Sequence, residues 1–290
     1  HGRWDGIRPG DTAPTAIWLP PAGGLDDETV QVPAGWFIAG DPGAPDGLPE
    51  RRVFVDAFAI GRDPVTNAQY IEWLDALVDD GREAEALAHA PRAFNAADRP
   101  LAYRRDAAGR FALDAADGMT WLPDGPVTSI SWRSARAFCA WRAARDGLPW
   151  RLPHSVEWEK AARGVDGRRH GFGDHCDATF AMTARSRPGS PGVVAVGAFP
   201  LDVSPYGVRG QAGNVRDLCL DAYRRDGPRL DAGRLVPVDE AIADEGFCVV
   251  KGGAYSSAPE QTLAGARYGF PPHHAAPPLG FRLCHSLPIS

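Results

Sequence analysis

Hydrophobic and polar residues alternate along two stretches near the start of the chain, residues 30–38 and residues 52–60. Alternation with a period of two is typical of strands that bury one face. The first stretch contains a turn and therefore predicts a pair of strands, and the second leads directly into Pro64. The intervening residues 40–50 lack the pattern and predict a loop.

The spacing of apolar residues predicts three helices. The first begins at Thr66, where Gln69 follows three residues later and completes a capping box. The second begins at a capping serine and spans residues 131–147, and the third opens after Pro153 and ends at Gly164. The apolar faces comprise Tyr70, Ile71, Leu74, Leu77 and Val78 in the first helix, Trp132, Ala135, Phe138 and Cys139 in the second, and Val156, Trp158, Ala161 and Ala162 in the third.

Long irregular segments surround these elements, in keeping with 33 glycines and 27 prolines. Residues 81–121 are polar and predict a surface excursion, and no helix is predicted from Gly171 onward. Short helices followed by brief strands predict one loop-rich α+β domain over residues 29–290. Residues 1–28 predict a linker or N-terminal strap with one short strand at 16–19.

The composition narrows the class of protein. With 44% hydrophobic and 23% charged residues, the chain resembles an ordinary globular protein. Its formal charge of -6 and pI near 5.8 argue against nucleic-acid binding, which normally needs a basic surface. No apolar run approaches the roughly 18 residues of a membrane span, so we expect no membrane insertion. The chain begins at His1 without a signal peptide, and we therefore expect it to be part of a larger multidomain protein.

The five cysteines are scattered, odd in number and without a Cys-x-x-Cys pair. This pattern indicates small buried residues in a reducing compartment, hence a cytoplasmic protein, and not a disulfide framework or a zinc knuckle. The spacing leaves open whether Cys248 and Cys284 come within disulfide reach. The cysteines are Cys139, Cys176, Cys219, Cys248 and Cys284.

Several blocks of sequence, in the same order, resemble the formylglycine-generating (sulfatase-modifying factor) family, whose fold is C-type-lectin-like. The resemblance implies that fold for this chain. It is closest to the branch fused to bacterial Ser/Thr protein kinases, on the stretches 166–169 and 202–207, which implies a kinase as companion. The blocks are residues 32–35, 64–70, 126–132, 151–153, 157–164, 206–208, 212–215, 249–255 and 279–283.

The resemblance also shows positions at which this chain lacks the residues that carry out the family's chemistry. The family's oxidases bind Cu(I) with two cysteine thiolates, soft ligands for a soft metal. This chain has Ser257 and Thr262 near those positions, and hydroxyls cannot replace thiolates. Ala254 and Arg216 stand where the family has a serine and a tryptophan. A copper site and a copper-dependent oxidation are therefore not expected.

The sequence gives weaker indications of other metal sites. A relative within the broader family uses iron held by a His-x-x-x-His-x-Glu triad, and the histidines here lack that spacing. His170, Asp174 and His175 lie close in sequence in a loop, but solvated side chains are the simpler interpretation. The carboxylate pairs that could serve acid–base chemistry lie in blocks that mark the fold, and we expect structural roles for them: Asp217 with Asp221, and Glu157 with Glu159.

A structural Ca²⁺ site is a further hypothesis that the resemblance implies. The family binds Ca²⁺ through backbone carbonyls and a terminal carboxylate, and Gly213, Val215 and Asp217 occupy those places. The family's other calcium-binding asparagines fall on Gly210 and Ala181, which weakens the hypothesis.

Residues 254–278 combine aromatic, small polar and proline residues, a mixture favoured in recognition surfaces. We therefore predict a non-catalytic module that binds a protein or peptide ligand at this face. The alternative is a plain surface loop with Tyr268 or Phe270 in the core. The predicted ligand-binding residues are Arg216, Ala254, Tyr255, Ser256, Ser257, Ala258, Tyr268, Gly269, Phe270, Pro271, His273, His274 and Ala275.

Three other functions remain open. The variable proteins of diversity-generating retroelements share the fold and a similar Gly-Phe-Arg ending, here residues 280–282, so the face could be genetically diversified. The chain could instead be the regulatory C-terminal domain of a kinase. A metal-dependent oxidase with an unrecognised metal site is the third alternative.

Overall fold

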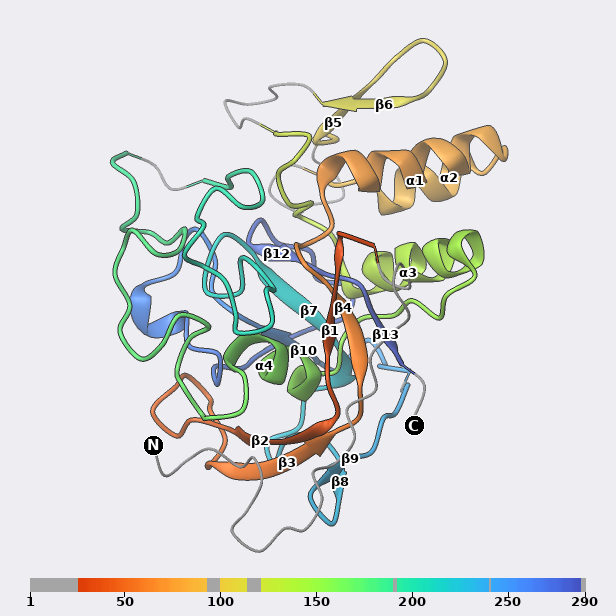
Figure 1. Cartoon of the computed structure of the whole chain (residues 1–290). Helices are drawn as coiled ribbons and strands as arrows, with labels where there is room; N and C mark the ends of the chain where they lie inside the picture. Colours follow the sequence, from red (N-terminus) through yellow and green to blue (C-terminus); the bar gives the residue numbers. More distant parts are fainter. Residues whose placement is uncertain (1–25, 93–99, 114–120, 190–191, 240, 288–290) are drawn as a thin grey trace, which may run out of the picture.

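The structure, a computed structural model, describes residues 26–92, 100–113, 121–189, 192–239 and 241–287. Within these ranges the chain has a mixed α/β fold with four α-helices and several small sheets, joined by long loops (Figure 1). This confirms the α+β class and the loop-rich character. The predicted strand at residues 16–19 lies outside the described residues. No helix in the described part of the chain is long and apolar enough to cross a membrane.

The first four strands divide between two sheets. β1 (Thr29–Val32) pairs antiparallel with β4 (Phe58–Gly61), whereas β2 (Gly35–Ala39) pairs antiparallel with β3 (Arg51–Val55). The predicted pairing within residues 30–38 is therefore wrong, although both strands form. Alternation identifies a strand, but which buried faces meet in three dimensions decides its partner.

The later strands complete these sheets and form a central one. The sheet orders are β1-β4-β13, β2-β3-β9-β8 and β11-β10-β7-β12, and β5 and β6 form a separate hairpin. The remaining strands are β5 (Tyr103–Arg105), β6 (Phe111–Leu113), β7 (Arg216–Ala222), β8 (Leu230–Asp231), β9 (Arg234–Leu235), β10 (Cys248–Lys251), β11 (Tyr268–Phe270), β12 (Leu279–Gly280) and β13 (Cys284–Ser286). Cys248 and Cys284 thus lie in different sheets, and all five cysteines are free.

The three predicted helices form where the sequence places them. The helix α1 (Asn67–Asp79) begins with the expected capping box, in which Gln69 N donates to Thr66 Oγ1 and Thr66 N donates to Gln69 Oε1. The helix α3 (Trp132–Asp146) is capped by Ser131 and ends at Gly147, where φ is +70°. The helix α4 (Ser155–Arg163) ends at Gly164.

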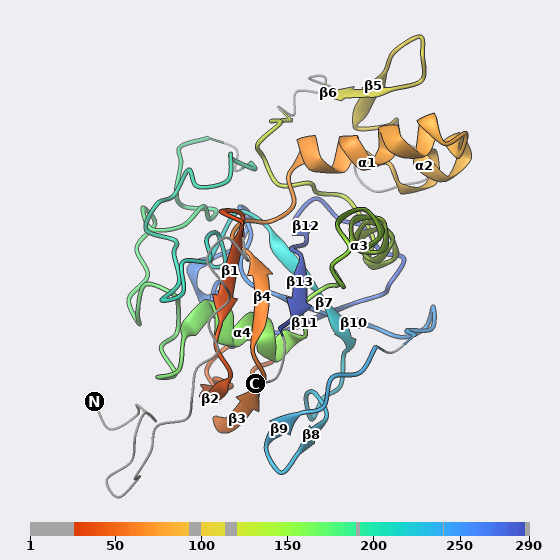
Figure 2. The same ribbon diagram turned by 45° about the vertical axis from the view of Figure 1, so that its right-hand side comes forward.

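The segment 81–121 is more ordered than the sequence indicates. It contains a fourth helix, α2 (Glu83–His89), and the β5–β6 hairpin, and α2 lies beside α1 and above α3 in both views (Figure 1, Figure 2). Ala86, Tyr103 and Phe111 join the largest hydrophobic core. The prediction of a polar surface excursion is therefore wrong for these residues, because two turns of helix with one fully buried alanine show no readable periodicity.

Aromatic side chains fill the core between α1, α3 and the central sheet. The ring of Phe138 stacks on Tyr70 and meets Trp73 and Phe281 edge to face, with centroids 5.4–5.7 Å apart. Trp73 also packs on His89 at the end of α2, so this packing joins α1, α2, α3 and the C-terminal segment at Phe281. These are the elements that carry the site described next.

Candidate functional site

Ser257 and Thr262, near the positions of the family's copper cysteines, are both buried and fully engaged within the chain. Ser257 Oγ accepts hydrogen bonds from Ala254 N at 2.9 Å and from Arg216 Nη2 at 3.1 Å. Thr262 Oγ1 donates to Pro259 O at 2.7 Å. The two hydroxyls therefore hold the 254–262 turn together.

Arg216 links this turn to strand β11. Its guanidinium lies 3.9 Å from the ring centroid of Tyr268, in addition to its bond to Ser257. Burial lowers the pKa of Arg216, and the buried Nε has no hydrogen-bond partner among the described residues. We call Arg216, Ser257 and Tyr268 the arginine cluster. It brings together three predicted site residues from three separate segments.

His170 contacts the 254–262 turn at Thr262. Because Thr262 Oγ1 already donates to Pro259, it accepts from His170 Nε2 at 3.0 Å. His170 also stacks on Phe172, with ring centroids 4.9 Å apart. Burial lowers the pKa of His170 to about 4, so the ring is neutral at pH 7. A histidine held this way supports the turn.

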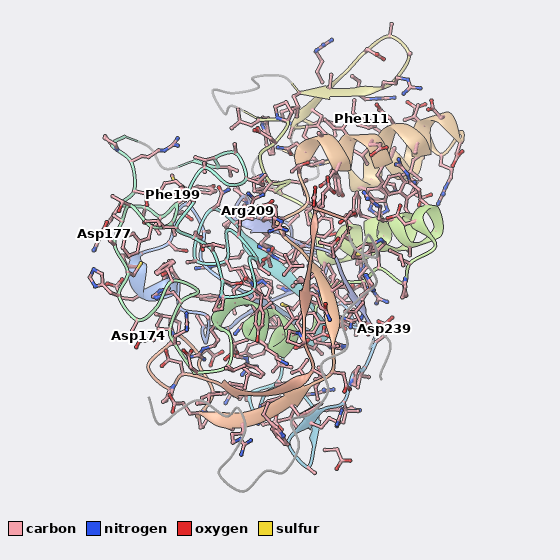
Figure 3. The ribbon with its side chains drawn as sticks, in the orientation of Figure 1. Phe111, Asp174, Asp177, Phe199, Arg209 and Asp239 are labelled. Carbon is pink, nitrogen blue, oxygen red and sulfur yellow. The ribbon has the colours of Figure 1, made fainter. Side chains whose placement is uncertain are left out.

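The hypothetical metal ligands His170, Asp174 and His175 do not converge. Asp174 Oδ1 accepts a hydrogen bond from Arg169 N, and His175 is exposed. Figure 3 shows Asp174 and Asp177 at the outer edge of the molecule. Over the described ranges, no group of three or more His, Cys, Asp and Glu side chains could hold a metal ion.

Asp217, the carboxylate of the hypothetical Ca²⁺ site, is fully buried and already has a cationic partner. Its Oδ2 accepts from Arg282 Nε at 2.7 Å and from Trp158 Nε1 at 2.6 Å. Gly213 O, a second proposed ligand, accepts from Val215 N at 2.9 Å. Asp217 Oδ1 is buried without a hydrogen-bond partner among the described residues, whereas Oδ2 is already bound to Arg282 and Trp158, and the Ca²⁺ site stays a prediction.

The other carboxylates singled out from the sequence are buried and accept hydrogen bonds or form ion pairs within the chain. Asp221 accepts from both Ser155 N and Ser155 Oγ at the start of α4. The remaining pairs are Glu157 with Arg151 at 2.7 Å, and Glu159 with Lys251 at 3.0 Å and with Arg163 at 2.9 Å.

The predicted recognition face contains both exposed and buried residues. Ser256 and His273 are exposed, whereas Ala254, Ser257 and Ala275 are buried. The other predicted residues are partly exposed: Arg216, Tyr255, Ala258, Tyr268, Gly269, Phe270, Pro271 and His274. Tyr268 and Phe270 are partly exposed and also pack against the largest hydrophobic core, so the plain-loop alternative stays open.

His273, His274 and Ala275 line a pocket of about 420 Å³, which we call the histidine pocket. The end of α2 contributes residues 88–90 and 92, and the start of α3 contributes residues 129–131 and 134. The pocket therefore lies where three segments far apart in sequence meet.

A chain of polar contacts forms one wall of the histidine pocket. His89 Nδ1 lies 3.0 Å from Ser134 Oγ, which lies 3.0 Å from Ser131 Oγ. The sequence marked Ser131 only as a helix cap and gave no sign of the role of His89, because α2 itself was not predicted. Recognising the helix would have placed His89 in its last turn.

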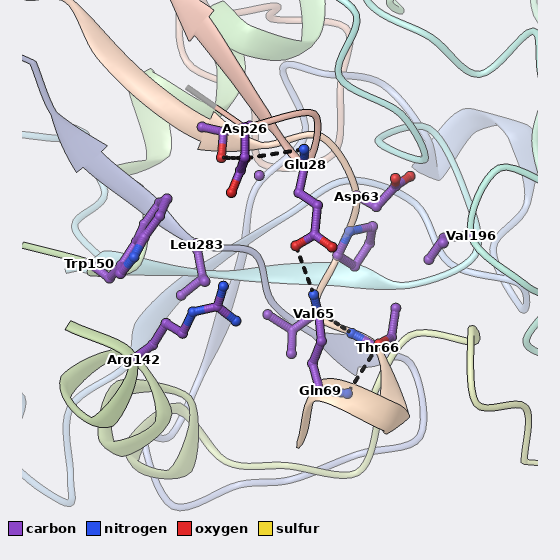
Figure 4. Close-up of a pocket in the computed structure, with 13 residues that line it drawn as sticks. Asp26, Glu28, Asp63, Val65, Thr66, Gln69, Arg142, Trp150, Val196 and Leu283 are labelled. Atoms are coloured by element: carbon purple, nitrogen blue, oxygen red, sulfur yellow. Dashed lines mark hydrogen bonds between the residues drawn. The ribbon is translucent and has the colours of Figure 1, made fainter. Parts of the chain in front are cut away.

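A smaller pocket of about 130 Å³ opens between β1, β4 and α1 (Figure 4). Its polar groups already have partners within the chain. Glu28 Oε2 accepts from Gln69 Nε2 at 3.2 Å, and Arg142 pairs with Asp146. None of the predicted site residues lines it, and we assign it no role.

Comparisons with known proteins identify relatives over most of the chain. The model of the sulfatase-modifying factor enzyme 1-like domain matches residues 20–287. The chain is 28% identical to the inactive C-alpha-formylglycine-generating enzyme 2 of Bos taurus, over 91% of this chain and 90% of that protein. It is 25% identical to the serine/threonine-protein kinase pkn1 of Chlamydia caviae, over 89% of this chain but 38% of the kinase. Treponema denticola variable protein 1 has a similar structure, with a TM-score of 0.61 and 20% identity over 89% of this chain and 95% of that one.

Proposed function

Because this chain belongs to the sulfatase-modifying factor enzyme 1-like domain family, we propose that it is a non-catalytic member that binds a protein or peptide. The proposal rests mainly on the burial and the hydrogen bonds of Ser257 and Thr262. Their hydroxyls are buried and hydrogen-bonded inside the chain, so neither is available to hold a soft metal or to act as a nucleophile. The similarity to a bovine relative whose name includes "inactive" supports the loss of the oxidation.

The face formed by residues 254–278 is suited to binding a peptide. The arginine cluster holds Tyr268 and the 254–262 turn rigid, and Ser256 and His273 project from the face as exposed polar groups. A rigid aromatic surface with adaptable polar groups loses little entropy on binding. We propose that this face, on a scaffold of C-type-lectin-like type, recognises an extended peptide.

The similarity to the kinase of Chlamydia caviae supports a place in a larger protein, as a regulatory domain of a kinase. Genetic diversification of residues 254–278 stays a separate prediction, because the likeness to the Treponema denticola protein shows the fold alone. Sequencing the corresponding coding stretch across the source population tests it. Substitutions confined to that stretch support diversification, and a uniform sequence contradicts it.

Peptide display on the immobilised chain tests the binding function directly. We expect peptides that bind the wild type and lose at least tenfold in affinity on Ser256→Arg, which fills the exposed centre of the face. Ala140→Arg, an exposed position on α3, is the matched control and should bind normally. Peptides that bind both variants equally, or the absence of any selected peptide, would contradict recognition at this face.

Metal binding tests the competing oxidase function. We expect the wild-type chain to take no Cu(I) from a chelator such as bicinchoninate, since hydroxyls are poor ligands for this ion. Stoichiometric Cu(I) or iron retained through purification and competition would overturn the proposal.

A further inference from the structure

The histidine pocket is lined by hydrogen-bond donors and by one permanently charged cation. His89 and His274 contribute imidazoles, Ser129 contributes a hydroxyl, and Arg92, which also interacts within the chain, is the one arginine of the lining. No carboxylate is among the described residues that line it, although the chain as a whole is acidic. We infer that the histidine pocket binds an oxyanion, a carboxylate or phosphoryl group, carried by the peptide ligand. This inference rests on the proposed function and names the chemistry of its ligand.

The start of α3 favours an anion in this position. The helix has 15 residues, and its first turn enters the pocket wall through Ser131 and Ser134. The N-terminal end of a helix has a positive electrostatic potential, because its first amides point outward and the peptide dipoles align. Ser134 N is already capped by Ser131 Oγ at 3.1 Å. The positive electrostatic potential at the start of α3 therefore attracts an anion together with the side-chain donors of the pocket.

Ser129 provides a second, independent observation at this pocket. Its side chain is 4% exposed, and its buried Oγ has no hydrogen-bond partner in the described part of the chain. Its backbone also has φ of +56°, a region that non-glycine residues rarely adopt. Buried hydroxyls are almost always paired in folded proteins. A ligand oxygen in the pocket that Ser129 lines would satisfy it.

The two imidazoles that would contact the anion are held in fixed orientations. His89 packs on Trp73 with ring centroids 5.0 Å apart, and His274 stacks on Phe270 at 5.4 Å. Burial lowers the pKa of both histidines. When Nδ1 of neutral His89 accepts the Ser134 hydroxyl hydrogen, the ring hydrogen lies on Nε2, and this is the donor that the inference assigns to the anion. Rigid donors lose little freedom on binding.

Calorimetry on the complete 290-residue chain tests the anion site with defined probes. The probes are inorganic phosphate, acetate, and the N-acetyl amides of phosphoserine, glutamate and glutamine. We expect saturable binding of phosphoserine or glutamate and none of glutamine, which matches glutamate in shape but is neutral. Tighter binding of a capped residue than of the matching free ion indicates a peptide-borne anion. Binding of the free ions alone overturns the peptide source.

A matched pair of variants locates the site. Ala88 and Ala84 are both exposed on α2, one helical turn apart, but only Ala88 lines the histidine pocket. Ala88→Glu should weaken anion binding at least tenfold through charge repulsion, whereas Ala84→Glu adds the same charge outside the pocket and should not. The anion should also shift the imidazole NMR signals of His89 and His274 and leave those of exposed His175 unchanged.

The outcomes separate this inference from the proposed function. No saturable binding of any anionic probe, or equal binding to both variants, overturns the anion site. A display peptide that loses affinity on Ser256→Arg but binds Ala88→Glu normally preserves the recognition face and still overturns the anion site. Anion binding that is sensitive to Ala88→Glu, without any display peptide, supports the site and contradicts peptide recognition.

Discussion

The guanidinium of Arg216 lies over the ring of Tyr268 at 3.9 Å, and this contact connects the central strand β7 to the edge strand β11. Tyr268 also donates its hydroxyl hydrogen to Gln261 O at 3.1 Å. A partly buried cation over an aromatic ring gains electrostatic stabilisation from the ring's negative face. In this chain that contact joins two segments of the predicted recognition face.

Replacing Tyr268 tests this contact. Tyr268→Leu removes the aromatic face, and we expect the free energy of unfolding to fall by about 1–2 kcal/mol. Tyr268→Phe keeps the ring and loses only the bond to Gln261, so it should cost less. Urea denaturation of both variants measures the difference. Equal losses would show that the hydroxyl, and not the ring, is the stabilising group.

Two neighbouring serines differ sharply in what they contact. Ser257→Ala leaves the buried Ala254 N and one Arg216 hydrogen without an acceptor, and we expect a loss of about 1–3 kcal/mol in the free energy of unfolding. Ser256→Ala changes an exposed side chain and should stay within about 0.5 kcal/mol of wild type. Thermal denaturation compares the two. A stable Ser257→Ala variant would contradict the structural role of this hydroxyl.

The pair Asp217–Arg282 should contribute more than surface pairs. Asp217→Asn leaves a fully buried guanidinium without its counter-charge, and we expect a loss of about 3–5 kcal/mol. Asp56→Asn breaks the pair with Arg234, which is half exposed, and should cost at most about 1 kcal/mol. Denaturant titrations measure both losses. Comparable losses would mean that burial does not set the strength of these pairs.

Asp217 is also the proposed carboxylate ligand of the Ca²⁺ site. Because Arg282 already neutralises Asp217, we expect the melting temperature of the wild-type chain to be unchanged after dialysis against a chelator and after addition of Ca²⁺. A rise of several degrees with Ca²⁺ that is absent in Asp217→Asn would establish the site implied by the family resemblance.

Local signals predicted the parts of the fold that local interactions decide. The capping box at Thr66, the cap at Ser131 and the glycines that end the second and third helices each act within a few residues, and each formed as expected. The partners of β1 and β2 were not predictable in this way. They depend on residues 12 to 32 positions away, which no local period encodes.

The candidate site was likewise only partly predictable from local sequence signals. Residues 254–275 were identified because their composition is unusual, and their contact with Arg216 followed from its place in a family block. The other wall of the histidine pocket comes from α2 and Ser129. The helix is too short to show a period, and the unpaired hydroxyl of Ser129 is visible only once the surrounding chain has been placed.

The last prediction concerns acid stability and His170. Burial lowers its pKa from 6.5 to about 4, and its charged neighbours are Arg169, Asp174 and Arg163. Between pH 6.5 and 4 the unfolded chain therefore binds a proton that the folded chain does not. Stability from this group is complete above pH 6.5 and is lost as the pH falls toward 4, by up to about 3 kcal/mol.

Asp202 works in the opposite direction, because burial raises its pKa from 3.8 to about 6 and the folded chain binds its proton first. Burial also lowers the pKa of His89, His274 and His285, and these groups add to the loss from His170 as the pH falls. Wild-type stability should therefore fall between pH 6.5 and pH 4 despite Asp202. His170→Gln removes one of these destabilising titrations, keeps a donor for Thr262, and should make the loss of stability between pH 6.5 and pH 4 smaller than in the wild type. The exposed His175→Gln is the control and should follow the wild-type profile. Urea titrations at a series of pH values measure the slopes, and identical slopes for His170→Gln and wild type would show that His170 does not titrate differently on folding.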